Sequence, residues 1–152
     1  MKILFAAAAI AAVSGAASAQ EFYIGAGVDL QTPHSGDQSV ASTIMGGAQF
    51  GNGPVTFGPE LEMNLTNGGD YNALRLRGIA RHDTGAVALM ASVGYTNYDV
   101  DGSGAVDGLN YGLGIDYELS QSVDLRAELI RDHAPDDDML VTNVRFGAVY
   151  GF

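Results

Sequence analysis

From residue 20 to the end of the chain, apolar and polar side chains alternate with a period of two. In the stretch 140–152, every second residue is apolar or aromatic except Thr142. Successive side chains of a β-strand leave opposite faces, so this period predicts strands rather than helices. The same alternation recurs along the chain and predicts eight strands, over residues 22–30, 43–50, 55–64, 74–79, 87–96, 109–118, 123–129 and 140–152.

The connections between these predicted strands alternate in length. Three are short and contain residues suited to tight turns, namely 51–54, 82–85 and 120–122. Between them lie four longer acidic connections, namely 31–38, 66–71, 98–107 and 132–138. This arrangement predicts an antiparallel up-and-down meander, with short turns at one end and long loops at the other.

The first nineteen residues have a different composition. Lys2 follows the initiator, residues 3–13 are an unbroken apolar run, and Ala17, Ser18 and Ala19 are small. This layout is typical of a secretory signal peptide that is cleaved after Ala19. A membrane-spanning helix needs about 20 apolar residues, and this run is too short. We therefore expect a signal peptide over residues 1–19 and one domain over residues 20–152.

Composition excludes several functional classes. Without Lys2 the chain keeps six arginines, no lysine and all eighteen acidic residues. Because phosphate backbones are bound by clustered Lys and Arg, no nucleic-acid partner is expected. The absence of cysteine excludes disulfides, thiolate metal sites and thiol catalysis. An exported chain of this kind is periplasmic, secreted or a barrel in an outer membrane.

The two alternating rows differ in chemistry, and this difference indicates which row faces lipid. An inward apolar row would make the protein a soluble exported carrier of the lipocalin kind. Four of the six arginines, however, lie in the polar row near carboxylates, and arginine is preferred where an ion pair is desolvated. Aromatic residues also gather at both ends of the predicted strands: Phe22, Phe50, Phe57, Tyr117, Tyr150 and Phe152 at the short-turn end, and Tyr71, Tyr95, Tyr98 and Tyr111 at the long-loop end. Two such girdles around an aliphatic band predict an all-β, eight-stranded antiparallel transmembrane barrel with its apolar row in lipid.

The signal peptide, the eight alternating strands and a last strand that ends on Phe152 resemble the small bacterial outer-membrane barrels. The nearest groups are the opacity-type porins and the transmembrane domain of outer membrane protein A. The resemblance implies an integral protein in the outer membrane of a Gram-negative bacterium, surrounded by lipid. We expect this protein to be non-enzymatic, with a structural or surface-exposed role in the envelope. It also implies that the barrel assembly machinery reads Phe146, Tyr150 and Phe152. The oligomeric state is left open.

An eight-stranded barrel is only wide enough inside to hold side chains, so its inward charges are expected to form a plug. Pairing of the third and fourth strands would place Glu60 opposite Arg77 and Glu62 opposite Arg75. On later strands Glu128 can reach Arg145, and Arg126 can reach Asp116 or Asp124. The expected interior charge network is therefore Glu60, Glu62, Arg75, Arg77, Asp116, Arg126, Glu128 and Arg145.

Two other interpretations of these charges are open. A pair of carboxylates can act as the acid and base of a hydrolase, but a filled barrel denies access to a substrate. The network can also act as a switch that opens a narrow pore. The three histidines fall in separate connections, so they do not suggest a lipid-deacylating enzyme.

Residues 99–110 follow the spacing of a calcium-binding loop for part of its length. Gly104 occupies the sixth position, and oxygen-bearing residues occupy the first, third, fifth and ninth, namely Asp99, Asp101, Ser103 and Asp107. Asn110 replaces the bidentate Glu at the twelfth position, and both neighbouring segments are predicted strands. The segment is therefore either a weak calcium site or an exposed acidic loop tip, and no other cofactor is expected.

Overall fold

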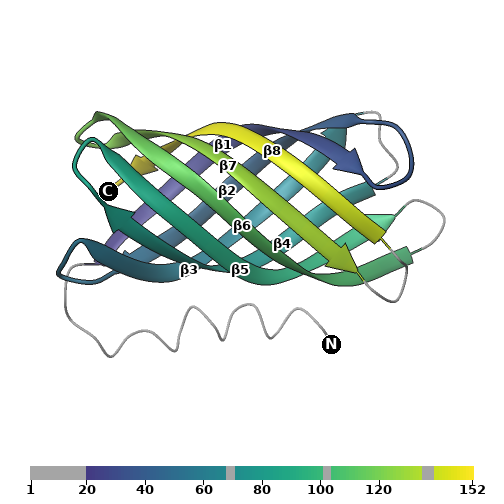
Figure 1. Ribbon diagram of the computed structural model, residues 1–152, viewed down its shortest axis with the longest axis horizontal. Helices are drawn as coiled ribbons and strands as arrows, with labels where there is room; N and C mark the ends of the chain where they lie inside the picture. The colour runs from purple at the N-terminus through teal and green to yellow at the C-terminus, as the bar shows by residue number, and fades with distance from the viewer. Residues whose placement is uncertain (1–19, 68–70, 101–103, 135–138) are drawn as a thin grey trace.

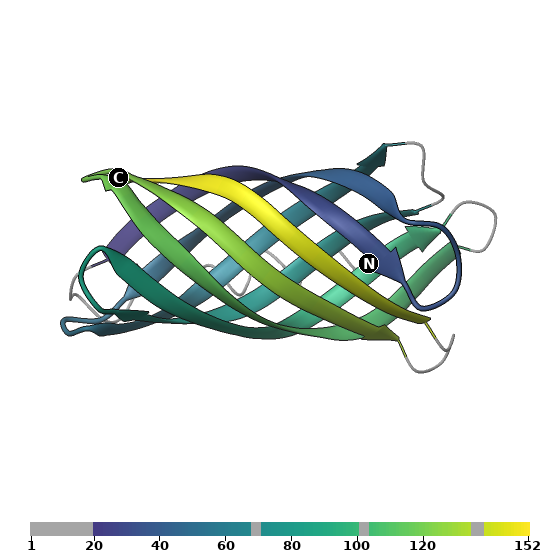
Figure 2. The same ribbon diagram turned by 45° about the horizontal axis from the view of Figure 1, so that its top comes forward.

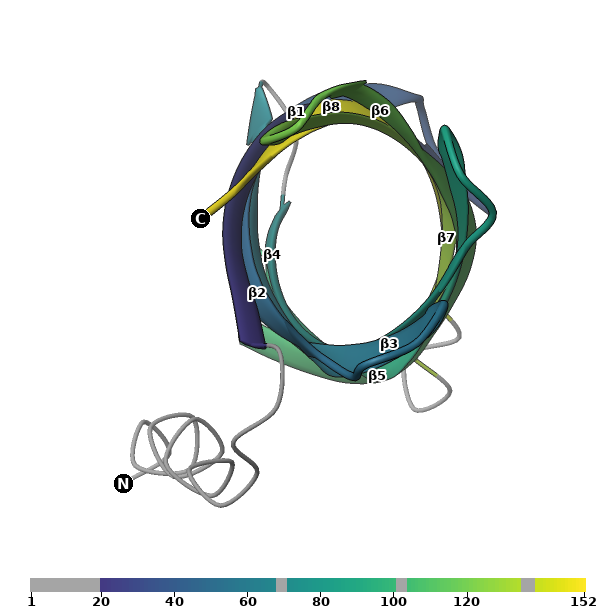
Figure 3. The same ribbon diagram turned by 90° about the vertical axis from the view of Figure 1, so that its left-hand side faces the viewer.

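The computed structural model describes residues 20–67, 71–100, 104–134 and 139–152. Within them, each strand pairs antiparallel with its neighbours in the chain, and β1 pairs with β8 to close a barrel (Figures 1 and 3). The strands are β1 (Gln20–Pro33), β2 (Ser39–Phe50), β3 (Val55–Asn67), β4 (Tyr71–Asp83), β5 (Val87–Val100), β6 (Gly104–Ser120), β7 (Val123–Ala134) and β8 (Met139–Gly151). The predicted all-β, eight-stranded up-and-down barrel is confirmed.

The two ends of the barrel differ as the connections predict. The β2–β3, β4–β5 and β6–β7 turns lie at one end together with the carboxyl terminus, and the β1–β2 connection lies at the opposite end, where β3, β5 and β7 also end (Figures 1 and 2). The strands extend further toward the long-loop end than the side-chain pattern predicts. The reason is that polar residues still form the backbone ladder, as in the pair Asn97 and Asp107.

The orientation of the two rows follows the prediction. Leu113, Val93 and Phe146 point outward and are 69%, 66% and 66% exposed, while Arg75 and Arg145 point into the barrel and are 0% exposed. No helix in the described part of the chain is long and apolar enough to cross a membrane. The exposed fractions of these side chains place the apolar row on the outer surface of the barrel and the charges of the central band inside it.

The aromatic side chains form most of the two predicted girdles. Tyr95 and Tyr111 are exposed toward the long-loop end, and Phe22, Phe57, Tyr117, Tyr150 and Phe152 are exposed toward the short-turn end. The placement of Tyr98 in a girdle is wrong, because this residue lies in the inward row of β5 and is 1% exposed. The side chain of Tyr71 is outside the described part of the structure.

Candidate functional site

The interior of the barrel holds a buried cluster of charged side chains, which we call the interior charge network. All of its members lie in the inward rows, and none is more than 4% exposed. The network consists of Arg75, Arg77, Arg126, Arg145, Asp29, Glu60, Glu62, Asp116, Glu128 and Asp132. These charges come from β1, β3, β4, β6, β7 and β8.

The ion pairs expected between neighbouring strands are present. Arg77 is in register with Glu60 and bonds to it, and Arg75 Nη1 lies 2.7 Å from Glu62 Oε1. Arg126 Nε donates to Asp116 Oδ1 over 2.8 Å. The sequence left Asp116 and Asp124 as alternative partners of Arg126. In the structure Arg126 pairs with Asp116, and Asp124 pairs with Arg81.

Other ion pairs of the network cross the lumen between strands that are not neighbours. Arg145 Nη1 on β8 donates to Glu62 Oε2 on β3 over 2.7 Å. Arg126 Nη1 on β7 donates to Glu60 Oε2 on β3 over 2.6 Å. Arg77 on β4 also bonds to Glu128 on β7. The network therefore ties opposite walls of the barrel together across its cross-section.

Two carboxylates of the network were not among the expected site residues. Asp29 accepts two hydrogen bonds from Arg145, each of 2.7 Å. Asp132 accepts from Arg75 Nε at 3.0 Å and Nη2 at 2.8 Å, and also from the Tyr98 hydroxyl at 2.7 Å. Asp29 lay in the polar row of a predicted strand and was recognisable there. Residues 131–133 of β7 are all polar, so the alternation stops before the strand does, and the sequence places Asp132 in a predicted loop.

The six buried carboxylates of the network outnumber its four arginines by two. Neutral donors satisfy the remaining oxygen atoms. The Tyr23 hydroxyl donates to Glu60 Oε2 over 2.9 Å, Asn64 Nδ2 donates to Asp29 Oδ2 over 2.8 Å, and Asn143 Nδ2 donates to Asp132 Oδ2 over 2.7 Å. Buried polar groups are costly unless they are hydrogen-bonded, and these contacts keep the acidic excess satisfied.

At the short-turn end, the inner wall opens into a polar cleft beyond the aromatic girdle. Arg81 Nη2 lies 2.8 Å from Asp124 Oδ2 and Arg81 Nε lies 3.6 Å from Asp116 Oδ2. Because Arg81 and Asp124 are both about one-fifth exposed, this pair is in contact with water and contributes little to stability.

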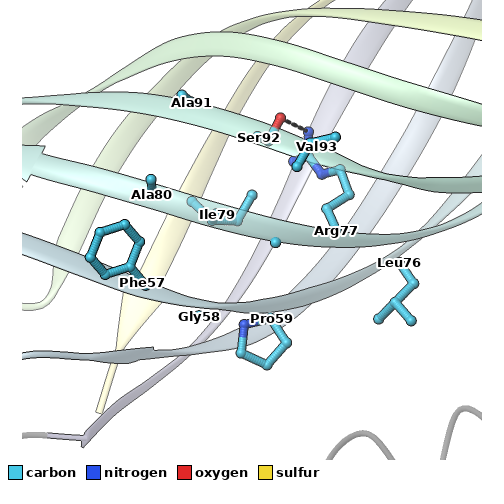
Figure 4. Close-up of a pocket in the computed structure, with 11 residues that line it drawn as sticks. Phe57, Gly58, Pro59, Leu76, Arg77, Ile79, Ala80, Ala91, Ser92 and Val93 are labelled. Carbon is cyan, nitrogen blue, oxygen red and sulfur yellow. Dashed lines mark hydrogen bonds between the residues drawn. The ribbon is translucent and has the colours of Figure 1, made fainter.

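A hollow on the outside of the barrel lies across β3, β4 and β5 (Figure 4). Its outward side chains are apolar, with Phe57, Leu76 and Val93 around the small residues Gly78 and Ala80. Arg77 and Ser92 also border it, but their side chains turn inward and hydrogen-bond to each other over 3.2 Å. The outward surface of the hollow is therefore hydrocarbon that faces the acyl chains of the lipid, and it carries no reactive group.

The candidate calcium loop is not supported as a metal site. β5 continues to Val100 and β6 begins at Gly104, so Asp99 and Asp107 lie in paired strands instead of encircling an ion. Asn97 Nδ2 donates to Asp107 Oδ1 over 2.6 Å. Asp101 and Ser103 lie outside the described residues. Among the described residues, no group of three or more His, Cys, Asp or Glu side chains is placed to hold a metal.

Two inward glycines of β6, Gly112 and Gly114, leave room for the side chain of Glu128 in the network. A Cβ added to Gly112 would lie 2.7 Å from Ser92 Oγ and 3.1 Å from Glu128 Oε1. Gly112→Ala is therefore expected to displace part of the network and lower the free energy of unfolding by about 1–3 kcal/mol. The matched control is Gly78→Ala on the outer face, where the nearest atom would be 3.8 Å away. Urea unfolding of both variants in phospholipid vesicles checks this, and equal stability of the two would contradict it.

A closed antiparallel barrel with an apolar outer band, aromatic rims and its charges inside defines the class of transmembrane β-barrels. Residues 3–152 match the family described as outer membrane protein beta-barrel domain, and the chain belongs to this family. It is accordingly a protein of the Gram-negative outer membrane, where its outer surface contacts lipid.

Solved structures of small outer-membrane barrels share the fold. Neisserial surface protein A is 16% identical, with 86% of this chain and 97% of that chain covered and a TM-score of 0.62. Ail, the attachment invasion locus protein of Yersinia pestis, is 13% identical, with 89% and 99% covered and a TM-score of 0.63. The N-terminal barrel domain of Pseudomonas aeruginosa OprF is 12% identical, with 86% and 97% covered and a TM-score of 0.60. No curated protein matches the sequence.

Proposed function

We propose that this protein is a non-catalytic component of the outer membrane whose interior charge network closes the barrel to ions and solutes. The observation that carries the proposal is the set of ion pairs that cross the lumen. Arg75, Arg77 and Arg145 are at most 1% exposed, and each contacts carboxylates from at least two other strands. Large side chains bonded across the axis leave the interior filled rather than open.

The bonding of the carboxylates supports a role without catalysis. Each of the six buried carboxylates of the network accepts a hydrogen bond from an arginine. A general acid must hold a proton to give, and a general base must reach a substrate. Carboxylates that accept hydrogen bonds from arginine and are enclosed by the barrel wall are not placed for either role.

A narrow, gated pore remains a second candidate, and one observation favours it. Arg77 contacts Glu60, Glu62 and Glu128 at the same time, so exchange among these partners offers a route to a second arrangement. The ion pairs that cross the lumen support the closed barrel, and the pore is therefore the less favoured candidate.

Conductance across a planar bilayer distinguishes the two candidates. The purified barrel is expected to give no current steps, while Arg77→Ala is expected to produce a cation-selective leak, because it removes a cross-lumen contact and increases the acidic excess. The conservative variant Arg77→Lys is expected to leak less than Arg77→Ala. Regular steps from the unaltered protein would overturn the closed-barrel proposal in favour of the pore.

We further propose that residues 1–19 are a cleaved signal peptide and that Phe146, Tyr150 and Phe152 form a signal for the barrel assembly machinery. All three aromatic side chains are exposed on the outer face of β8 or just after it. The mature protein is expected to begin at Gln20, and removal of Phe152 is expected to reduce the assembled, heat-modifiable form in cells. An unprocessed amino terminus, or normal assembly without Phe152, would contradict the respective proposal.

A further inference from the structure

The outer face carries a polar patch at the long-loop end of β7, β8 and β1, where the rest of the lipid-facing surface is mostly apolar. We call this the rim patch, and it consists of Arg131, His133, Thr142 and Thr32. Arg131 is in register with Thr142, and Thr142 is in register with Thr32, so the three side chains lie in one outward row across neighbouring strands. His133 follows Arg131 on the same face of β7, and both are exposed.

Arg131 differs from every other arginine in the chain. The five others are paired with carboxylates inside the barrel or at its short-turn mouth. Among the described residues, Arg131 makes no ion pair. Its neighbour on β6 is Tyr111 and its neighbour on β8 is Thr142, and neither is acidic.

The rim patch offers hydrogen-bond donors and contains no carboxylate. Guanidinium, imidazole and hydroxyl groups can all donate to an anion, and a guanidinium matches the oxygen atoms of a phosphate in two parallel bonds. The outward Asp107 lies on β6 beyond Leu109, and its carboxylate is engaged by Asn97 over 2.6 Å. This donor set is suited to an oxyanion.

The depth of the patch in the membrane identifies the kind of anion. Arg131 pairs with Tyr111 of the long-loop girdle, and aromatic girdles lie at the level of the lipid headgroups. An arginine is costly on the lipid face at the bilayer midplane but well tolerated near the interface. The long-loop end faces the exterior in barrels of this class, so the neighbouring headgroups are those of the outer leaflet.

We propose that the rim patch binds the phosphate group of a lipid in the outer leaflet. Arg131 supplies the charge-assisted bonds, and His133 with the hydroxyls of Thr142 and Thr32 supplies further donors around the phosphate. The inference depends on the outer-membrane placement of the barrel and is independent of whether the interior is closed.

The test compares lipid selectivity of the unaltered barrel and its variants. The protein is reconstituted in phosphatidylcholine vesicles that contain a small fraction of spin-labelled phosphatidic acid or spin-labelled phosphatidylcholine, and the motionally restricted fraction is measured by electron paramagnetic resonance. The unaltered barrel is expected to prefer phosphatidic acid by about fivefold. Arg131→Gln is expected to remove most of this preference, and Arg131→Lys to keep part of it.

Controls distinguish binding at the rim patch from misfolding and from binding of free phosphate. Thr142→Val is expected to weaken the preference without abolishing it, since the charge remains. Heat-modifiable mobility of every variant shows whether the barrel is folded, and an outward substitution at an exposed position is expected to leave it folded. An unchanged preference in folded Arg131→Gln would overturn the proposal. Loss of the preference when inorganic phosphate is added at equal concentration would assign the site to free phosphate instead of lipid.

Discussion

Replacing Arg145 with methionine is expected to lower the free energy of unfolding by about 3–5 kcal/mol. The guanidinium of Arg145 donates to both oxygens of Asp29 and to both oxygens of Glu62, with distances of 2.7–3.0 Å. All three side chains are at most 1% exposed. Without the arginine, the carboxyl groups of Asp29 and Glu62 would remain buried with fewer cationic partners, and the cost of burying them without compensation is the main source of the loss.

The double variant Asp29→Asn with Arg145→Met tests that physical reason. It is expected to recover part of the lost stability, because the stranded charge on Asp29 is removed together with its partner. Arg81→Met, the same substitution at the water-exposed mouth of the barrel, serves as the matched control and is expected to change stability by less than about 1 kcal/mol. Urea unfolding in phospholipid vesicles, followed by far-ultraviolet circular dichroism, suits a chain without tryptophan. Equal free energies of unfolding for Arg145→Met and the unaltered barrel would show that the interior charge network does not stabilise the fold.

Replacing Leu113 with arginine is expected to destabilise the barrel by about 2–4 kcal/mol. Leu113 is 69% exposed on β6 and lies between Tyr111 and Tyr117, which mark the two girdles on this strand. A guanidinium at this position would be placed in the hydrocarbon band of the membrane. The same side chain is stable inside the barrel only because carboxylates surround it there.

Leu119→Arg is the control for this depth dependence. Leu119 is 60% exposed on the same strand but lies beyond Tyr117, at the short-turn rim. The arginine can reach water from that position, so the expected cost is about 0–1 kcal/mol. Unfolding of both variants in vesicles gives the comparison, and equal costs at the two positions would show that β6 does not cross a bilayer in the assigned register.

The sequence was sufficient to predict the number of strands, their order and their orientation. Because side chains alternate with a period of two, all inward residues of a strand have either odd or even numbers. One of the two rows is charged and the other is aliphatic, and this difference indicates which face meets lipid. Pairs between neighbouring strands follow from the register, as for Glu60 and Arg77. These features depend on local alternation and on connection length, both of which can be read along the chain.

Contacts across the lumen could not be predicted in the same way. Arg145 reaches Glu62 from β8 to β3, and that geometry depends on the curvature of the closed barrel and on side-chain length. The sequence alone did not indicate that Asp132 belongs to the network or that Tyr98 points inward, because both residues lie where a strand continues into polar sequence. The alternation could still have identified them, since each residue is an even number of positions away from the inward residues of its own strand.

Fluorescence quenching of a single tryptophan at position 113 tests the orientation of the barrel wall most directly. The chain contains no other tryptophan, so all indole emission from Leu113→Trp reports that one site. In vesicles of lipid brominated near the ends of the acyl chains, strong quenching is predicted, together with weak quenching by iodide in the surrounding water. Emission quenched by aqueous iodide and unaffected by the brominated lipid would mean that the aliphatic row does not face the membrane.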